Sequence, residues 1–598
     1  MATDRPLPSS PLRSRRLLGG LAAVLLVVLA CASCSTVPPV GNVFPARGAS
    51  EGDPLSRPFV RILAADPKPN GSPNEIVSGF LAAAASFDDL TRTVARKYLT
   101  GEAQRSWSPY DGISIYDQRS LTSDPLRDGV QEARVTLRTT LLGTVDGDSH
   151  YVPSETETGS ELTMGFTLIK VAGQWRISSA PAGLLLSNDD FKRAYRPFDL
   201  TFAADGAEGL VVDQVRVPIN PRESLAKSLV DRLIDGPTRP LQGAVRPALG
   251  TEVNVNSVVA DGDLVVIDFT YGIVEAVRDS ADREALSAQL AWTLKPMTES
   301  RRIEVRVNGE TFPGGAFIID PRDYDRFNPD VLSGEAQAYF LQQGKLHVID
   351  KERENPVLPG PGDAQGRRFT DLAVSYERSA KIAALAQDGG VWVSGMAPGS
   401  QWQRWIPGAK PTAPSWDRYG FVWSVVRDDG TSKVYRSGGP SGPPTLVAAP
   451  QLTPTDVSAF RVARDGARVA VISDDGHGQR VLVGTIDRAK LQVQNLRVLV
   501  PAEDAQEISD IAWRDASTLL VLTKKKSERE LTPWSVTQGI RADTAKAASR
   551  IESITAAPDP LPVLAGTADG GIVAWDPQKK QWTTLVKSGA SPPVYPLG

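Results

Sequence analysis

The residues with the most reactive side chains are few and lie far apart. The two cysteines of the sequence, Cys31 and Cys34, are both near its start, so the chain beyond them can form no disulfide. Their Cys-x-x-Cys spacing also occurs in redox motifs, but such a motif needs a strand-helix setting that this stretch lacks. The three histidines, His150, His347 and His477, are too widely separated to predict a multi-histidine metal site. Any catalysis would have to use carboxylates, serines or lysines.

Catalytic motifs are missing from the sequence. It contains no Gly-x-Ser-x-Gly elbow, Walker phosphate loop, HExxH motif or dinucleotide-binding glycine fingerprint. Asp261-Gly262-Asp263 lacks the spacing and the final glutamate of a calcium loop. Lys and Arg number 66 against 70 Asp and Glu, which gives no electrostatic footprint for nucleic acid. We therefore expect no enzyme activity, no cofactor, no metal and no nucleic-acid partner.

The stretch around the cysteines has the pattern of an export signal. Three arginines at positions 13, 15 and 16 precede an uncharged apolar core, Leu17–Ala30, and the small residues Ala32 and Ser33 follow it. As a helix the core would reach roughly 21 Å, which is short of the ~30 Å hydrocarbon layer of a membrane. The order basic, apolar, small predicts a signal peptide over residues 1–34.

Cys34 lies where this signal resembles a bacterial lipobox, in which the cysteine is lipidated and becomes the first mature residue. A lipobox usually has Leu or Val three residues earlier, where this chain has Cys31. Cys31 follows Val28-Leu29-Ala30 and is the competing acceptor. Several acyl chains would anchor the protein stably, whereas one binds only reversibly. We expect lipid on Cys34 and anchoring at the extracytoplasmic face of the cell membrane; the alternatives are a plain cleaved signal or an uncleaved anchor.

Residues 35–71 are predicted to be a tether, and residues 72–198 the first folded domain. The tether is rich in Pro, Gly and Ser. The domain opens with a capping box at Ser72–Glu75, and a second helix is predicted over Phe87–Leu99. Alternating apolar residues then predict long strands. Helices followed by hairpins predict an α+β fold, and the order resembles the nuclear-transport-factor-2-like cone, either filled by side chains or holding a ligand.

Residues 199–329 form a second predicted α+β domain. A cap at Asn220–Glu223 and a stop at Gly236 bound one helix, and a second runs from Ser280 to Lys295, where Pro296 is expected to end it. Hairpin turns are predicted at Asp261-Gly262 and Asn308-Gly309. The segments LAKSLVDRLIDGP, LVVIDF, LSAQLAWTL and IEVRVNG, in that order, resemble a GerMN domain. That resemblance implies a binding or assembly module without agreed catalytic residues.

Residues 330–598 are predicted to be an all-β propeller. Short apolar runs alternate with turns, and the acidic residues of five similar turns are 40, 48, 50 and 44 residues apart: Glu377, Asp417, Asp465, Asp515 and Asp559. Such a period is typical of propeller blades. We interpret each turn as preceding an inner strand, and we expect five to seven blades, with the terminal segments sharing one.

Two clusters in the propeller have alternative interpretations. Four tryptophans, Trp402, Trp405, Trp416 and Trp423, could line a glycan groove or pack between blades. The basic run Lys524–Lys526 could form a docking patch or a solvated loop.

The whole arrangement resembles the actinobacterial lipoprotein LpqB family. The order of lipobox, cone-like domain, GerMN domain and propeller carries this resemblance over essentially the full chain. It implies an accessory protein that binds the extracytoplasmic domain of an MtrB-like sensor histidine kinase, within an MtrA-MtrB type two-component system, and affects cell envelope and division. The alternative is a lipoprotein that binds the cell wall, through peptidoglycan or another glycan.

Overall fold

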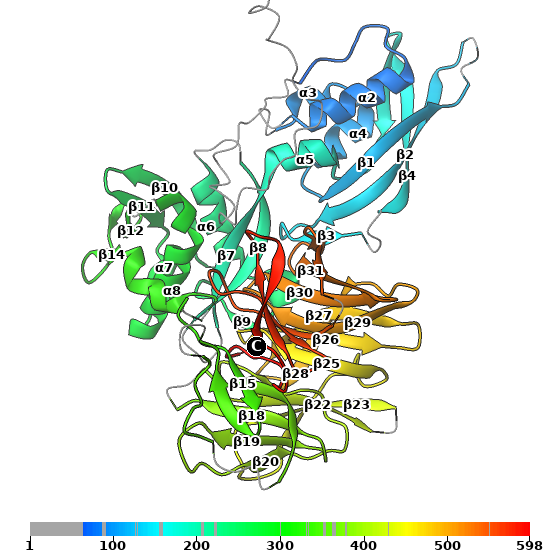
Figure 1. The fold of residues 1–598 in the computed structure, drawn as a ribbon. Helices are drawn as coiled ribbons and strands as arrows, with labels where there is room; N and C mark the ends of the chain where they lie inside the picture. Colours follow the sequence, from blue (N-terminus) through cyan, green and yellow to red (C-terminus); the bar gives the residue numbers. More distant parts are fainter. Residues whose placement is uncertain are drawn as a thin grey trace, which may run out of the picture. The chain divides into compact units, whose positions relative to one another are not determined.

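A computed structural model gives the fold (Figure 1). The residues it describes are 64–86, 91–125, 127, 129–154, 159–204, 209–219, 224–250, 252–298, 301–330, 332, 334–350, 354–361, 366–376, 379–428, 430–548 and 550–597. The predicted signal peptide, most of the tether, and both Cys31 and Cys34 lie outside these residues. Three folded parts follow in chain order, which we name the N-terminal domain, the middle domain and the propeller.

The N-terminal domain begins with helix α2, Pro73–Ala84, as its capping box predicts. The Ser72 hydroxyl accepts a hydrogen bond from the Glu75 backbone, and the Glu75 carboxylate accepts one from the Ser72 backbone. The helix predicted over Phe87–Leu99 was wrong in the part that the structure describes; residues 87–90 lie outside it. Residues 91–99 contain only the four-residue α3, Thr93–Arg96, because Arg92 just before it has a left-handed backbone with φ of 56°. Helix α4, Gly101–Ser106, follows.

A six-stranded sheet packs against α2. Its order is β5-β4-β2-β1-β6, with β3 added to β2. The strands are β1 (Ile113–Ser123), β2 (Glu132–Val145), β3 (Tyr151–Pro153), β4 (Ser160–Val171), β5 (Gln174–Ser179) and β6 (Leu184–Ser187). The Phe80 ring on α2 lies 5.2 Å from Trp107 and 6.3 Å from Phe166, centroid to centroid. Val135 and Leu137 are fully buried, as the alternation on β2 predicts. This is the expected α+β fold, and large side chains fill its core.

The middle domain contains two sheets and several helices. Helix α5 (Asn188–Ala194) leads into the first sheet, whose order is β8-β7-β9, and the second has the order β10-β11-β12-β13 with β14 paired to β12. The strands are β7 (Tyr195–Ala204), β8 (Leu210–Pro218), β9 (Val245–Arg246), β10 (Val255–Asp261), β11 (Leu264–Phe269), β12 (Arg302–Val307), β13 (Glu310–Thr311) and β14 (Phe317–Ile319). The helices are α6 (Leu225–Asp235), η2 (Arg239–Leu241), α7 (Gly272–Ala276), α8 (Ser280–Thr293), α9 (Lys295–Thr298) and η3 (Pro321–Phe327).

The turns, caps and helix ends predicted for this domain can be compared with the structure. Hairpin turns occur at Asp261-Gly262 and Asn308-Gly309, and Gly262, Asn308 and Gly309 have positive φ. The helix predicted from Ser280 to Lys295 is α8, which ends at Thr293, before Pro296. Pro296 is the second residue of the separate short helix α9, where a missing backbone N–H costs nothing. The predicted cap at Asn220–Glu223 lies outside the described residues.

The propeller has six sheets among the residues that the structure describes. They are β15–β16, β17–β20, β21–β24, β25–β28, β29–β33 and β34–β37. Their strands are β15 (Tyr339–Gln342), β16 (Lys345–Val348), β17 (Phe369–Val374), β18 (Lys381–Ala386), β19 (Val391–Gly395), β20 (Gln403–Ile406), β21 (Ser415–Trp416), β22 (Val422–Asp428), β23 (Thr431–Ser437), β24 (Thr445–Val447), β25 (Asp456–Val462), β26 (Arg468–Asp474), β27 (Gln479–Asp487), β28 (Gln492–Val500), β29 (Gln506–Trp513), β30 (Thr518–Lys525), β31 (Glu528–Ser535), β32 (Ile540–Arg541), β33 (Ala545–Ala547), β34 (Ile551–Thr555), β35 (Leu564–Thr567), β36 (Ile572–Asp576) and β37 (Gln581–Val586).

The ends of the propeller share a blade. Tyr339 on β15 pairs with Val594, and Gln342 pairs with Ala590, so residues near the C-terminus complete the first sheet. The interpretation that each repeated turn precedes an innermost strand was wrong by one strand. The first strands β17, β21, β25, β29 and β34 contact one another in succession and are therefore innermost. The turns join each innermost strand to the second strand of its blade.

Candidate functional site

The three histidines occupy unrelated positions. His347 Nδ1 lies 2.9 Å from the Asn355 carbonyl oxygen, and its ring stacks on Phe340. His477 is exposed beside Asp475. His150 is buried at the end of the N-terminal domain. Within the described ranges, no group of three or more His, Cys, Asp or Glu residues could hold a metal ion.

The tryptophan cluster belongs to the packing of the propeller. Trp402 and Trp405 are 7% exposed, and Trp416 and Trp423 are fully buried. The Trp416 indole N–H donates to the Ala373 carbonyl at 3.1 Å, and the Trp423 indole donates to Asp417 Oδ2 at 2.8 Å. Side chains with so little exposed surface cannot line a glycan groove, so blade packing is the correct interpretation.

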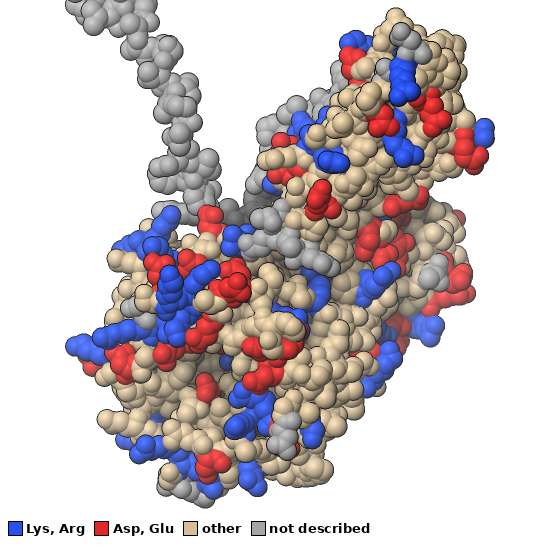
Figure 2. Space-filling view, turned by 90° about the vertical axis from the view of Figure 1, so that its right-hand side faces the viewer, with Lys and Arg blue, Asp and Glu red and all other residues tan. Residues whose placement is uncertain are grey.

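The basic run Lys524–Lys526 is largely neutralised by nearby acids. Lys524 Nζ lies 2.9 Å from Glu507 Oε2, and Lys525 Nζ lies 3.5 Å from Glu503 Oε2. Over the face displayed in Figure 2, Lys and Arg side chains alternate with Asp and Glu, and neither sign forms a continuous patch. These contacts favour the solvated loop over a docking patch for an anionic polymer.

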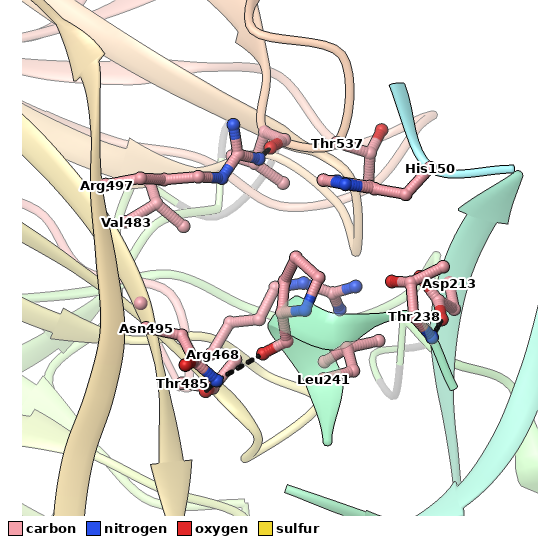
Figure 3. A pocket seen from close by; sticks show the side chains of 13 residues that line it. His150, Asp213, Thr238, Leu241, Arg468, Val483, Thr485, Asn495, Arg497 and Thr537 are labelled. Atoms are coloured by element: carbon pink, nitrogen blue, oxygen red, sulfur yellow. Dashed lines mark hydrogen bonds between the residues drawn. The ribbon is translucent and has the colours of Figure 1, made fainter. Parts of the chain in front are cut away.

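A small cavity lies where the three folded parts meet (Figure 3). Its volume is about 30 Å³. The N-terminal domain, the middle domain and the propeller all contribute to its wall, and all belong to the same compact unit. The polar side chains lining it are those of His150, Asp213, Thr238, Arg468, Thr485, Asn495, Arg497 and Thr537.

Direct hydrogen bonds hold this junction together. The Arg468 guanidinium lies 2.6 Å from Asp465 Oδ2 within the propeller and also donates to the Val212 carbonyl of β8. The Asn495 side chain donates to the Pro240 carbonyl at 3.0 Å. The Arg216 backbone N–H donates to the Ser149 carbonyl at 2.8 Å, which ties the middle domain to the N-terminal domain.

The electrostatic environment of the cavity disfavours extra positive charge. Burial and, to a smaller extent, the nearby Arg497 guanidinium lower the pKa of His150 to about 4, although Asp146 and Asp148 act in the opposite direction. Burial, together with the like charge of Arg468, lowers the pKa of Arg497 to about 10. His150 is therefore neutral near pH 7, and Arg497 remains charged.

Asp213 lines the same cavity from β8. Burial raises the pKa of its carboxyl group, although two hydrogen bonds from Thr238 act in the opposite direction. The Thr238 backbone N–H is 2.7 Å from Oδ2, and its hydroxyl is 2.9 Å from Oδ1. Both carboxylate oxygens of Asp213 thus already have a donor.

Sequence reasoning missed this junction. We considered His150 only as a metal ligand, and nothing distinguished Arg468 or Arg497 from the other arginines of the chain. The partners of Arg468 include Val212, 256 residues earlier, so no local spacing could have indicated the contact.

A second candidate surface is a face of the middle-domain sheet. Register places Val259, Val266, Glu304 and Ile318 opposite one another on β10, β11, β12 and β14, in one row across the sheet. Their neighbours in sequence, Ile267, Val305 and Phe317, point to the opposite, buried face, where Arg283 of α8 stacks on Phe317 at 3.8 Å. Val259 is 55% exposed and Ile318 39% exposed, whereas Val266 and Glu304 between them are only 8% and 9% exposed. The row is therefore a strip whose exposed side chains are the two apolar ones at its ends, on β10 and β14.

Among the residues that the structure describes, none of the helices is both long enough and apolar enough to cross a bilayer.

Comparison with known proteins identifies all three folded parts. The family described as "Lipoprotein LpqB, N-terminal domain" matches residues 66–192, "Sporulation and spore germination" matches residues 199–312, and "Lipoprotein LpqB beta-propeller domain" matches residues 344–596. Lipoprotein LpqB of Thermobifida fusca is 30% identical, covering 98% of this chain and 99% of that protein. Lipoprotein LpqB of Streptomyces avermitilis is 26% identical, covering 96% and 97%.

Solved structures show weaker likenesses. TolB from Acinetobacter baumannii aligns with a TM-score of 0.35 at 9% identity, covering 57% of this chain and 98% of that one. The tandem GerMN domains of GerM from Bacillus subtilis align with a TM-score of 0.19 at 14% identity, covering 32% and 60%. Scores this low decide nothing further about the molecule.

Proposed function

We propose a signalling function from one premise: the chain belongs to the LpqB family of lipoproteins. The protein is a membrane-anchored, extracytoplasmic accessory protein without catalytic activity of its own. It binds the extracytoplasmic domain of an MtrB-like sensor histidine kinase and thereby affects cell envelope and division. The resemblance to the family suggests the kinase as the partner, and the exposed side chains Val259 and Ile318 of the middle domain offer it a contact surface.

Lipid on Cys34 would confine the protein to the plane of its receptor. Confinement raises the effective concentration of the two partners, so a modest contact surface suffices for binding. The lipid can be tested by mass spectrometry of the membrane-extracted protein, which should lose its lipid mass in Cys34→Ala and keep it in Cys31→Ala. Lipid retained in Cys34→Ala would move the acceptor to Cys31.

The two exposed ends of the strip, Val259 and Ile318, are the observation that carries the binding proposal. Apolar side chains left exposed on a sheet face can serve as contact points for a protein partner. The kinase domain is the occupant that we assign to this strip. Binding there changes signalling only if the strip has different affinities for the two signalling states of the kinase.

In-cell crosslinking, followed by pull-down of the full-length lipoprotein, tests the proposal. We expect recovery of a histidine kinase with the native chain, and at least a tenfold loss with the double variant Val259→Asp, Ile318→Asp. The matched control is Leu446→Asp on β24 of the propeller, where the native side chain is 57% exposed and well separated in sequence from the strip. That control should recover the kinase normally.

Two results would contradict the proposal. One is the absence of any histidine kinase under conditions that recover other membrane proteins. The other is sedimentation of the protein with isolated cell wall at a level that the strip variants do not change, which would favour the alternative of a cell-wall-binding lipoprotein.

A further inference from the structure

The middle domain and the propeller are joined at several separate points. Arg468 of β26 donates to the Val212 carbonyl of β8, and the Asn495 side chain of β28 donates to the Pro240 carbonyl of η2 at 3.0 Å. The segment that enters the propeller adds a third point, where Asp330 accepts a hydrogen bond of 2.9 Å from the backbone of the turn between β29 and β30. Contacts at three separate points oppose rotation of one part on the other.

The N-terminal domain meets these two parts through the loop between β2 and β3. The Gly147 carbonyl accepts a hydrogen bond from the Arg232 guanidinium of α6 at 3.1 Å, and the Ser149 carbonyl accepts one from the Arg216 backbone N–H of β8 at 2.8 Å. His150, the last residue of the same loop, is buried and lines the small cavity together with side chains of β28. Neighbouring residues of one short loop therefore reach both the middle domain and the propeller.

Strand β3, which directly follows the loop, adds two more contacts. The Arg216 guanidinium lies 5.5 Å from the centre of the Tyr151 ring. A Cβ built on Gly539, in the turn between β31 and β32, would lie 3.1 Å from Pro153 Cβ, and Figure 1 shows β3 beside β31. The covalent connection between the N-terminal domain and the rest is α5, which leads directly into β7. The loop and β3 thus lie beside a single connection of the chain.

A cleft separates the N-terminal domain from α6 next to the loop. Tyr110 and Ile113 line it from the N-terminal domain, Ser228 and Asp231 line it from α6, and residues of the loop line it as well. Tyr110 is 76% exposed, so this part of the N-terminal domain is not packed against the middle domain. Parts of a chain move relative to one another unless a large apolar interface holds them.

We propose that residues 146–150 are a clasp, which holds the N-terminal domain on the body formed by the middle domain and the propeller. When the clasp opens, the N-terminal domain rotates about the connection between α5 and β7, and the cleft widens. The predicted tether precedes the N-terminal domain, so this rotation changes how the other two parts are presented to a partner. The clasp requires no particular partner and is independent of the kinase-binding proposal.

Energy transfer between single pairs of fluorophores tests the clasp. The chain without its predicted signal peptide contains no cysteine, so labels can be attached to Val171→Cys in the N-terminal domain and Leu446→Cys in the propeller, where the native side chains are 42% and 57% exposed. The native chain should give one narrow distribution of distances. The clasp variant Arg216→Ala, Arg232→Ala removes the contact with the Tyr151 ring and one hydrogen bond to the loop, and it should broaden the distribution roughly twofold, as a released hinge does.

A second pair of labels and a control variant separate the clasp from general loosening. The pair Val259→Cys, Leu446→Cys reports on the middle domain and the propeller, and its distribution should stay narrow in the clasp variant. The control Arg278→Ala, Arg322→Ala removes two exposed arginines of the middle domain and should change neither distribution.

Two results would overturn the proposal. A narrow distribution for the first pair of labels in the clasp variant would show that the N-terminal domain is held without the loop. An equally broad distribution in the native chain would show that the loop holds nothing. If the double variant does not fold, the single variant Arg232→Ala, which removes only the bond to the Gly147 carbonyl from the clasp, gives the same test with a smaller broadening.

Discussion

Arg468 of the propeller donates a hydrogen bond to the Val212 carbonyl of the middle domain, across 256 residues of chain. The same guanidinium forms an ion pair with Asp465, and both side chains are almost fully buried. One arginine thus links the turn between β25 and β26 to strand β8. This side chain is one of several that join the middle domain to the propeller.

Arg468→Gln should lower the free energy of unfolding by about 3–5 kcal/mol, because removing one partner leaves the Asp465 charge buried and uncompensated. Chemical denaturation of the full chain measures this change. The control is Arg322→Gln, which breaks an exposed pair with Asp320 and should leave stability nearly unchanged. Equal effects of the two substitutions would contradict the importance of the Arg468 contact.

His150 should make stability depend on pH in the mildly acidic range. Its pKa is about 4 in the folded protein against 6.5 for the free side chain, with Arg497, Asp146 and Asp148 as the charged groups around it. Its contribution is complete above pH 6.5 and is lost as the pH falls toward 4, since the unfolded chain then binds the extra proton. The loss amounts to roughly 3 kcal/mol.

The variant His150→Gln isolates this contribution. It keeps a polar side chain of similar reach but cannot titrate. Urea unfolding of both proteins between pH 7 and pH 4 should show a steeper loss of stability in the native chain. Parallel curves would show that His150 titrates normally in the fold.

Gly79→Ala should destabilise helix α2, although alanine is normally favoured over glycine in a helix by about 1 kcal/mol. An added Cβ would lie 2.6 Å from a ring carbon of Tyr98, which is itself held by a hydrogen bond from its hydroxyl to the Ala65 carbonyl. We expect a net loss of about 1–3 kcal/mol in the free energy of unfolding. Gly165→Ala on β4 meets no atom within 4 Å and is the control; a stabilised Gly79→Ala would contradict the close contact.

The pairing that closes the propeller can be trapped covalently. The double variant Gln342→Cys, Ala590→Cys places two thiols at a paired position, where disulfide geometry is within reach. We expect an intrachain disulfide on mild oxidation and an increased Tm that reducing agent reverses. Gln342→Cys with Val594→Cys should not crosslink, because Val594 pairs three residues away, about 10 Å along the strand. Crosslinking of both pairs alike would argue against the observed register.

Local signals in the sequence predicted local structure well. The Ser72–Glu75 capping box and the glycine turn at Gly262 depend on residues three or fewer positions apart, and the structure confirms both. The propeller period was also visible, because each blade repeats the same turn. The position of the turn within the blade could not be predicted. The innermost and second strands are both apolar, and they differ only in the strands that they contact.

The junction depended on information that the sequence does not contain locally. Arg468 becomes unusual only when the fold buries it and brings it to a partner in another domain. The helix predicted over Phe87–Leu99 failed for a related reason. The periodicity of apolar residues continued past Arg92, but the left-handed backbone at that residue interrupts the helix.

Because residues near the C-terminus close the propeller, its first sheet can be completed only after the last segment of the chain has been synthesised. The Leu341 backbone N–H on β15 donates to the Ser591 hydroxyl, 250 residues later. During synthesis, the edge of β15 therefore stays unpaired until the final segment of the chain has been made. An exposed edge of this kind invites aggregation and proteolysis. Chains interrupted anywhere within the propeller would keep that edge open, so ring closure distinguishes finished molecules from unfinished ones.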